Sequence, residues 1–316
     1  MALNANLRGA LYMAIAMAAL TTNDTLTKSV LPQMGMGQVI LLRGVVATSL
    51  LCILIFRTDG FPSLKFLAHR SILTRVACEI GGTTTFIFAL AHLPLANVTA
   101  VLQALPLAVT MGAAMVLAEP VGWRRWSAIS VGFVGVMIIV RPGLGDFSAW
   151  SLLALLTVGF CAVRDLSTRL IPQDIPSVGV SVATSAGVTL SGAALLPFTG
   201  GWQPVEVPSA LSIFLAGILV VVGYQFVIKA MRQGDISFMA PFRYTSLLWA
   251  ILLGFLFFGD VPDALMLFGS ALVVGSGLYA LYRERIVGHD LPITESTAPA
   301  ITTSGLDTKP VHDRRI

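Results

Sequence analysis

Ten runs of apolar residues fill most of the chain, and they constrain its fold more than any other feature. They cover residues 8–28, 38–56, 73–91, 96–118, 124–141, 147–165, 177–198, 208–229, 237–258 and 263–282. A helix of about 20 apolar residues is long enough to cross a bilayer. The connections are short and leave no room for a soluble domain. The sequence therefore predicts an all-α integral membrane protein with ten transmembrane helices.

The composition agrees with a chain that lies mostly in lipid. Hydrophobic residues make up 56% of the 316 residues and charged residues only 11%, whereas a soluble domain has about 25% charged residues. A soluble fold of this size could not hide so much apolar surface. Cys52, Cys78 and Cys161 fall inside apolar runs without metal-ligand spacing. No phosphate-binding or dinucleotide-binding glycine pattern occurs, so we expect neither a metal nor a cofactor.

Lysine and arginine residues gather in alternate connections. One set of connections carries most of them, and the opposite set carries only Lys28 and Arg141. Because cytoplasmic loops are enriched in Lys and Arg, ten spans then predict that both termini lie in the cytoplasm. We expect the membrane to be a bacterial inner or plasma membrane. Residues 284–316 lose the apolar pattern and are rich in Thr, Pro, Asp and Arg, which predicts a disordered cytoplasmic tail.

The segment NDTLTK near the N-terminus is similar to RDLSTR in the middle of the chain. Asp24 matches Asp165 at an offset of 141 residues, and the same offset relates Glu119 to Asp260. Each match alone is weak, but agreement at one offset indicates an internal repeat.

The offset divides the chain into two halves with five spans each, residues 8–141 and residues 147–283. An odd number of spans makes the second half enter the membrane from the opposite side, so the two repeats are inverted. Inverted repeats are typical of alternating-access transporters, whose substrate site lies between the halves near the midplane. The sequence therefore predicts a secondary transporter of a small organic metabolite.

Two stretches resemble the EamA-type transporters of the drug/metabolite transporter superfamily. They are LPLANVTAVLQALPLAVTMGAAMVLAEPVGWRRWSAISVGFVGVMIIVRPG (93–143) and APFRYTSLLWAILLGFLFFGDVPDALMLFGSALVVGSGLYALYRER (240–285). The Glu119-Pro120 pair, the WRRW cluster and the glycine-rich fifth and tenth spans carry the resemblance. It implies ten helices in two inverted repeats around a central cavity, with the fifth and tenth spans at the periphery. It does not fix the substrate, since relatives carry amino acids, cofactors, sugar-type metabolites or drugs.

Two arginines interrupt apolar runs and are candidates for binding the solute. A charge inside the membrane costs about 2.5–3.5 kcal/mol on insertion scales, so such residues are functional candidates. Arg243 lies about 10 Å into its span, at 1.5 Å per residue, and we predict that it binds an anionic group through two parallel hydrogen bonds. If it is structural, its expected partner is Asp165 or Glu79. Arg43 could reach headgroups, pair with Asp24 or hold an anionic group.

Three uncharged residues are further candidates for the cavity wall. Pro106 releases a backbone carbonyl one turn earlier, so Gln103 either satisfies local polar groups or lines the cavity. Tyr244 matches Gln103 at the offset of 141 residues. Trp249 falls near the middle of its span, which favours the cavity because most membrane aromatics lie at the interfaces.

Four residues are candidates for gating or for binding a coupling ion: Asp24, Lys28, Glu79 and Asp165. The spacing of Asp24 and Lys28 allows a local ion pair on one helix, and Asp165 with Arg169 repeats that spacing. Each pair either neutralises itself or forms part of a gate, in which Asp24 takes up a proton. For Glu79, the expected partner is Arg75, four residues earlier.

Two other functions are compatible with parts of the sequence. GLGD (143–146) matches the motif of intramembrane aspartyl proteases, but that chemistry needs a second aspartate, and no Tyr-Asp pair occurs in a span. A membrane sensor or scaffold without transport activity is the other alternative. For a transporter, the absence of an ATP-binding motif predicts coupling to a proton, an ion or exchange. The expected partners are an anionic or zwitterionic small molecule and membrane lipid but no nucleic acid, and a homodimer is compatible with the sequence.

Overall fold

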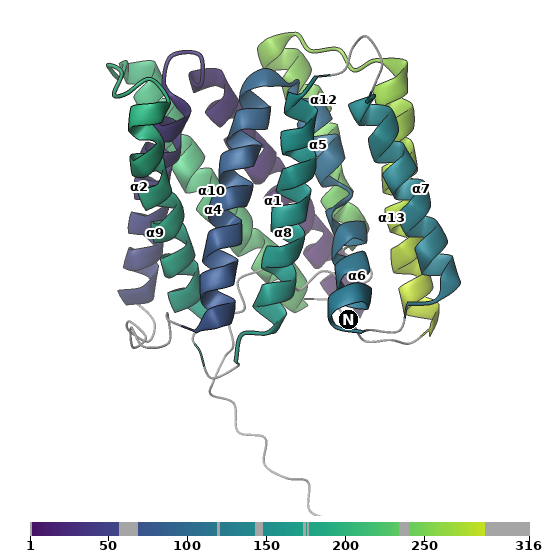
Figure 1. Cartoon of the computed structure of the whole chain (residues 1–316). Helices are drawn as coiled ribbons and strands as arrows, with labels where there is room; N and C mark the ends of the chain where they lie inside the picture. Colours follow the sequence, from purple (N-terminus) through teal and green to yellow (C-terminus); the bar gives the residue numbers. More distant parts are fainter. Residues whose placement is uncertain are drawn as a thin grey trace, which may run out of the picture.

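The computed structural model describes residues 2–56, 69–118, 121–142, 148–172, 175, 177–233 and 240–287. All regular elements in this part of the chain are helices, and the long ones lie side by side in one bundle (Figure 1). In chain order they are α1 (Ala2–Val30), α2 (Met36–Phe56), α4 (Arg70–His92), α5 (Leu95–Leu102), α6 (Leu105–Val116), α7 (Trp123–Val140), α8 (Trp150–Arg169), α9 (Ser177–Leu195), the 3₁₀ turn η1 (Leu196–Phe198), α10 (Val207–Gln233), the 3₁₀ turn η2 (Ala240–Tyr244), α12 (Thr245–Phe258) and α13 (Ala264–Val287).

The described residues contain 9 helical segments that are long and apolar enough to cross a membrane. Three of them combine two elements each: α5 with α6, most of α9 with η1, and most of η2 with α12. A membrane interior offers no water to backbone groups, and helices satisfy those groups within one segment. The chain is therefore an all-α integral membrane protein. The 29-residue α1 falls outside the 9 segments, so its role as a tenth span remains a prediction.

The two elements around position 103 form one span that is broken in its middle. Pro106 lies in the first turn of α6, and without an N–H it cannot bond to the carbonyl of Leu102. The span therefore continues as two helices instead of the single one expected over residues 96–118. The span expected over 237–258 is also irregular, because η2, which contains Pro241, precedes α12.

Three predictions from the sequence involve residues that the structure does not describe. Glu119 of the repeat comparison, the GLGD segment and residues 288–316 of the expected tail all lie outside the described residues. The tail was expected to begin at residue 284, but α13 continues to Val287, so the helix extends past that boundary.

The helix pairs α2–α9 and α7–α13 lie at opposite edges of the bundle in Figure 1, and the members of each pair pack against each other. The contact between α7 and α13 depends on two glycines. A Cβ added to Gly135 would lie 2.7 Å from the carbonyl oxygen of Gly269, and a Cβ added to Gly269 would lie 2.7 Å from that of Gly135. Any larger residue at either position would force the two backbones apart.

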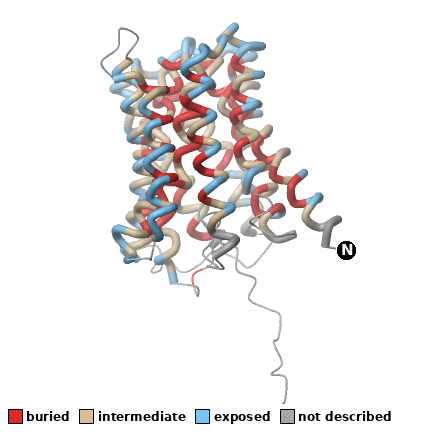
Figure 2. The backbone as a smooth tube through the Cα atoms, turned by 90° about the vertical axis from the view of Figure 1, so that its right-hand side faces the viewer, coloured by how far each residue is buried: buried red, intermediate tan, exposed pale blue. Residues whose placement is uncertain are grey.

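The outer faces of the helices carry exposed apolar side chains. On α12, for example, Leu248 is 67% exposed, Phe255 57% and Leu256 63%. Figure 2 shows buried residues toward the inside of the bundle and exposed ones on its outer faces. Such a surface would be unfavourable in water but suits contact with lipid.

Candidate functional site

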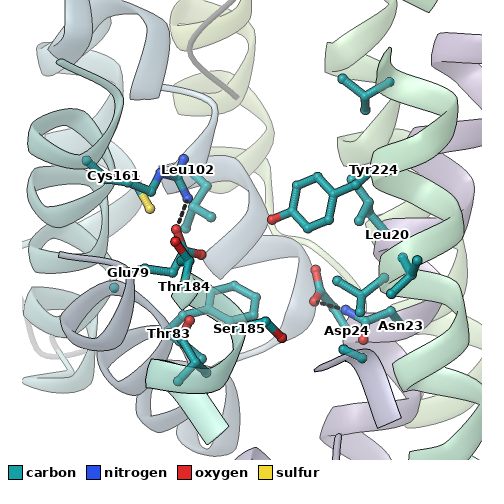
Figure 3. Close-up of a pocket in the computed structure, with 18 of the residues that line it drawn as sticks. Leu20, Asn23, Asp24, Glu79, Thr83, Leu102, Cys161, Thr184, Ser185 and Tyr224 are labelled. Carbon is teal, nitrogen blue, oxygen red and sulfur yellow. Dashed lines mark hydrogen bonds and ion pairs between the residues drawn. The ribbon is translucent and has the colours of Figure 1, made fainter. Parts of the chain in front are cut away.

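A cavity of about 390 Å³ lies inside the bundle. Its described lining comes from both halves of the chain, on α1, α2, α4, α5, α6, α8, α9, α10, η2 and α12. Neither α7 nor α13 contributes a described lining residue, whereas α2 and α9 at the opposite edge of the bundle do. Figure 3 shows polar side chains from α1 and α10 facing others from α4, α8 and α9 across this space.

An ion-pair network occupies one wall of the cavity. The Arg164 guanidinium lies 3.2 Å from Glu79 and 2.8 Å from Asp165. Arg75 donates a hydrogen bond to Thr168 Oγ1 and interacts electrostatically with Glu79, but the direct ion pair of Glu79 is with Arg164 and not with Arg75 as expected. Tertiary packing of α4 against α8 gives Glu79 a partner from another helix instead. We call Arg75, Arg164 and Arg243, which all line the cavity, the arginine cluster.

A second charged group lies on α1 and α2. The Asp24 carboxylate accepts a hydrogen bond of 2.9 Å from the Asn23 side chain and interacts electrostatically with Arg43. Both Asp24 and Arg43 line the cavity. Of the three positions weighed for Arg43, the structure therefore places it beside Asp24 at the cavity wall.

Lys28 does not form the expected ion pair with Asp24. Its ammonium donates to the carbonyl oxygens of Leu90 at 2.8 Å and Leu93 at 2.7 Å, and it lies 5.4 Å from the centre of the Phe258 ring. The last carbonyls of a helix have no partner within the helix and favour a cation. Lys28 therefore satisfies the C-terminal end of α4, outside the described cavity lining.

Gln103 joins the two broken spans. Its side-chain amide donates to Ser246 Oγ at 2.9 Å and to the carbonyl oxygen of Tyr244 at 3.5 Å. Gln103 also lines the cavity. It therefore both satisfies local polar groups and lines the cavity, which the sequence offered as alternatives. The break at residues 103–104 and the start of α12 at 245 lie at corresponding positions, since Gln103 and Tyr244 are 141 residues apart.

The remaining candidates lie in different places. Arg243 lines the cavity and interacts electrostatically with Asp165, and Asp165 is itself fully buried behind the described lining. Tyr244 lies behind the lining too, with its hydroxyl against Gly277 of α13. Trp249 is 36% exposed and is not a lining residue. The structure therefore does not bring Trp249 to the cavity, because its helix turns this side chain to the outer face.

Reasoning from the sequence missed Tyr224 on α10 as a candidate site residue. Its ring extends into the space between the walls in Figure 3, on the side opposite Glu79. Tyr224 and Gln225 both line the cavity. Two adjacent polar residues after Gly223, in a long apolar run, were the available signal. Arg164 was likewise not considered as a site residue, although it forms ion pairs with both Glu79 and Asp165.

Comparisons with known proteins give the family. The sequence profile described as the EamA-like transporter family matches residues 7–141. The chain is 30% identical over 276 residues to a riboflavin transporter of Vibrio cholerae, a match that covers 85% of this chain and 91% of that protein. It is 23% identical to an S-adenosylmethionine uptake transporter of Rickettsia felis, with coverage of 90% and 96%.

Two further matches agree with this result. The pseudopaline exporter of Pseudomonas aeruginosa strain PAO1 is 25% identical, and the match covers 84% of this chain and 93% of the exporter. A protein of known crystal structure has 18% identity and a TM-score of 0.58, over 91% of this chain and 100% of the other, which shows a shared fold. On this evidence, the chain belongs to the EamA-like transporter family of the drug/metabolite transporter superfamily.

Proposed function

We propose that the protein is a secondary transporter that moves a small organic metabolite through the central cavity by alternating access. The observation that carries this proposal is the pair of broken spans at corresponding positions, α5–α6 and η2–α12, both beside the cavity. Interrupted helices at matching positions of two repeats are the best structural pointer to a transporter's binding site.

The packing of the helices supports an arrangement in two inverted repeats. In the proposed repeats, α1 corresponds to α8, α4 to α10, and α6 to α12. The contact of α1 with α10 then corresponds to the contact of α8 with α4, and both contacts exist. The contact of α1 with α12 likewise corresponds to that of α8 with α6. Thr48 and Thr189, which are 141 residues apart, lie within hydrogen-bonding distance at 3.1 Å, as expected for residues near a two-fold axis.

The boundary between the repeats has support from the family profile. The profile ends at residue 141, where the first repeat of residues 8–141 is proposed to end. Residues 147–283 would then form the second repeat. Together with the distribution of Lys and Arg, this arrangement favours cytoplasmic termini in a bacterial inner membrane.

Five charged residues have one of three roles in this proposal: solute binding, coupling or gating. Arg43 and Arg243 bind the solute together with Gln103, because all three line the cavity. Asp24 and Glu79 are candidates for coupling, since both carboxylates reach the cavity and face arginines. Lys28 is a gating candidate, because its two hydrogen bonds join the end of α1 to the end of α4.

Asp165 and Tyr244 act indirectly in this proposal. Asp165 holds Arg164 at 2.8 Å and thereby positions it. Tyr244 contributes its backbone carbonyl to Gln103 and does not touch the solute.

Solute counterflow in proteoliposomes tests the proposal. Riboflavin and S-adenosylmethionine are the first labelled solutes to try, because relatives are named for them, followed by a panel of other metabolites. We expect at least one solute to be exchanged by protein-containing vesicles and not by empty ones. Absence of counterflow for the whole panel, with correctly folded protein, would instead favour a sensor or scaffold.

A further inference from the structure

We infer that the solute carries an oxyanion group, a carboxylate or a phosphate, and that Arg75 is a ligand of this group. The inference rests on the proposed function and adds the chemical class of the solute. Arg75 was expected from the sequence only as a structural partner of Glu79.

The described charges around the cavity are unequal in number. Among its described lining residues are four arginines, Arg43 and the three of the arginine cluster, and two acidic residues, Asp24 and Glu79. Asp165, paired with Arg164 behind the wall, adds a third carboxylate. Among these described residues the arginines outnumber the carboxylates by one. A surplus of guanidinium groups makes the potential in the cavity positive, so an anionic solute would be favoured over a neutral or cationic one.

The excess charge lies at the arginine cluster. Asp24 faces Arg43, and these two charges compensate each other. Glu79 and Asp165 remain as the two carboxylates beside the three guanidinium groups of the cluster. Arg164 holds both of these carboxylates within 3.2 Å, and it repels both Arg75 and Arg243 electrostatically. An added anion would relieve this repulsion.

Arg75 has a hydrogen-bond donor that lacks an acceptor. The residue is only 9% exposed, one Nη donates to Thr168, and the buried Nε–H has no acceptor among the described residues. Leaving a buried donor unpaired costs about 1–3 kcal/mol. A guanidinium presents its N–H groups in a planar fork that fits the two oxygens of a carboxylate or a phosphate. An oxyanion at the cavity wall would supply the missing acceptor.

A hydroxyl group of the lining can complete such a subsite. Thr83 of α4 lines the cavity, and Figure 3 shows it on the same side of the space as Glu79. A hydroxyl donates one hydrogen bond. The Thr184 hydroxyl already donates to the carbonyl oxygen of Val180, and Ser185 is hydrogen-bonded to Thr48, so of these three residues Thr83 is the one that can bind a remaining oxygen of the anion.

A native cysteine offers a direct measurement of occupancy. Cys161 lines the cavity on α8, close to Arg164 in the sequence. In a full-length variant with Cys52→Ser and Cys78→Ser, the rate of maleimide labelling of Cys161 reports whether the subsite is filled. The probes are two matched pairs, nicotinate with nicotinamide and ribose 5-phosphate with ribose, each at millimolar concentration. The two pairs separate a carboxylate from a phosphate.

We expect at least one anion to slow labelling severalfold more than its neutral partner. Arg75→Gln should abolish that protection, and Arg75→Lys should retain only part of it because lysine keeps the charge but loses the fork. The matched control is Arg124→Gln, which removes the same charge from an exposed position on α7. Monodisperse elution of each variant shows that it is folded.

The inference would be overturned by equal protection from neutral and anionic probes, by no protection from either anion, or by protection that persists in Arg75→Gln. Counterflow measured with the unmodified protein distinguishes failure of the anion-site inference from failure of the proposed transport function. Exchange of neutral solutes alone would leave the transporter assignment standing and reject the anion site, whereas absence of any exchange would reject the transporter.

Discussion

Replacing Tyr244 with phenylalanine should stabilise the protein and leave transport intact. Tyr244 is 8% exposed, and its hydroxyl has no hydrogen-bond partner among the described residues. A Cβ added to Gly277 would lie 1.8 Å from this hydroxyl, so the oxygen presses closely against α13. The residue is not part of the described cavity lining. Among the described residues its hydroxyl therefore forms no hydrogen bond, and it lies away from the described cavity lining.

The size of the effect follows from the missing partner. A buried hydroxyl without a hydrogen bond costs about 1–3 kcal/mol, and Tyr244→Phe removes this oxygen while keeping the ring and its packing. The free energy of unfolding should therefore rise by up to about 1–3 kcal/mol. Each kcal/mol corresponds to about 2–4 °C in Tm for a chain of 150–250 residues and to less for a longer one, so for this chain of 316 residues we expect an increase in Tm of a few degrees at most.

The assay combines thermal denaturation of the purified protein in detergent with solute counterflow. The matched control is Tyr224→Phe, which removes a hydroxyl from a ring that extends into the cavity (Figure 3). We expect Tyr224→Phe to weaken transport without raising Tm. A lower Tm for Tyr244→Phe, or a loss of transport as large as that of Tyr224→Phe, would refute the reasoning.

Three further predictions concern coupling, binding and topology. Asp24→Asn should abolish gradient-driven accumulation but leave exchange largely intact, as measured by uptake and counterflow in the same vesicles; loss of both with poor expression would indicate a structural role. Arg243→Lys should raise the half-saturation concentration of the solute severalfold, and Arg243→Ala should nearly abolish transport while membrane expression persists; normal transport by the alanine variant would exclude a role in binding. A cysteine at the exposed Gln203 should react with an impermeant reagent from outside the cell, and labelling only after permeabilisation would contradict the proposed orientation.

The positions of the helices could be predicted well from the sequence, because a membrane imposes one requirement on every span. Each span must be apolar over about 20 residues and must satisfy its own backbone. The break before Pro106 was also foreseeable, since a missing N–H has the same local effect in any helix. The irregular start of the span at Pro241 follows from the same cause.

The partners of the charged residues could not be predicted from spacing along one helix. Neighbours four residues apart were expected to pair, yet Glu79 pairs with Arg164 of α8, and Lys28 binds carbonyls at the end of α4. Within a bundle, a buried charge is stabilised by a partner on another helix. The packing of α4 against α8, and of α1 near the end of α4, decides which charged groups become neighbours. Local periodicity does not contain that information.

Aromatic residues posed a similar problem. Trp249 and Tyr224 both lie in apolar runs, and the sequence favoured Trp249 for the cavity because of its depth. The structure places Tyr224 at the cavity and Trp249 on an outer face. Depth along a span does not specify which side of the helix faces inward. The buried residues of α12 are Leu247, Ala250 and Gly254, a stripe that does not include Trp249.

The central claim is that the solute passes through the cavity, and blocking the cavity tests it most directly. Ala47 on α2 lines the cavity and is 8% exposed, whereas Val45 on the same helix is 46% exposed on the outer face. A tryptophan at position 47 would occupy a large part of the 390 Å³ space, and one at position 45 would lie in lipid. Counterflow in proteoliposomes should be abolished by Ala47→Trp and retained by Val45→Trp, with both variants monodisperse. Normal counterflow in folded Ala47→Trp would contradict transport through this cavity.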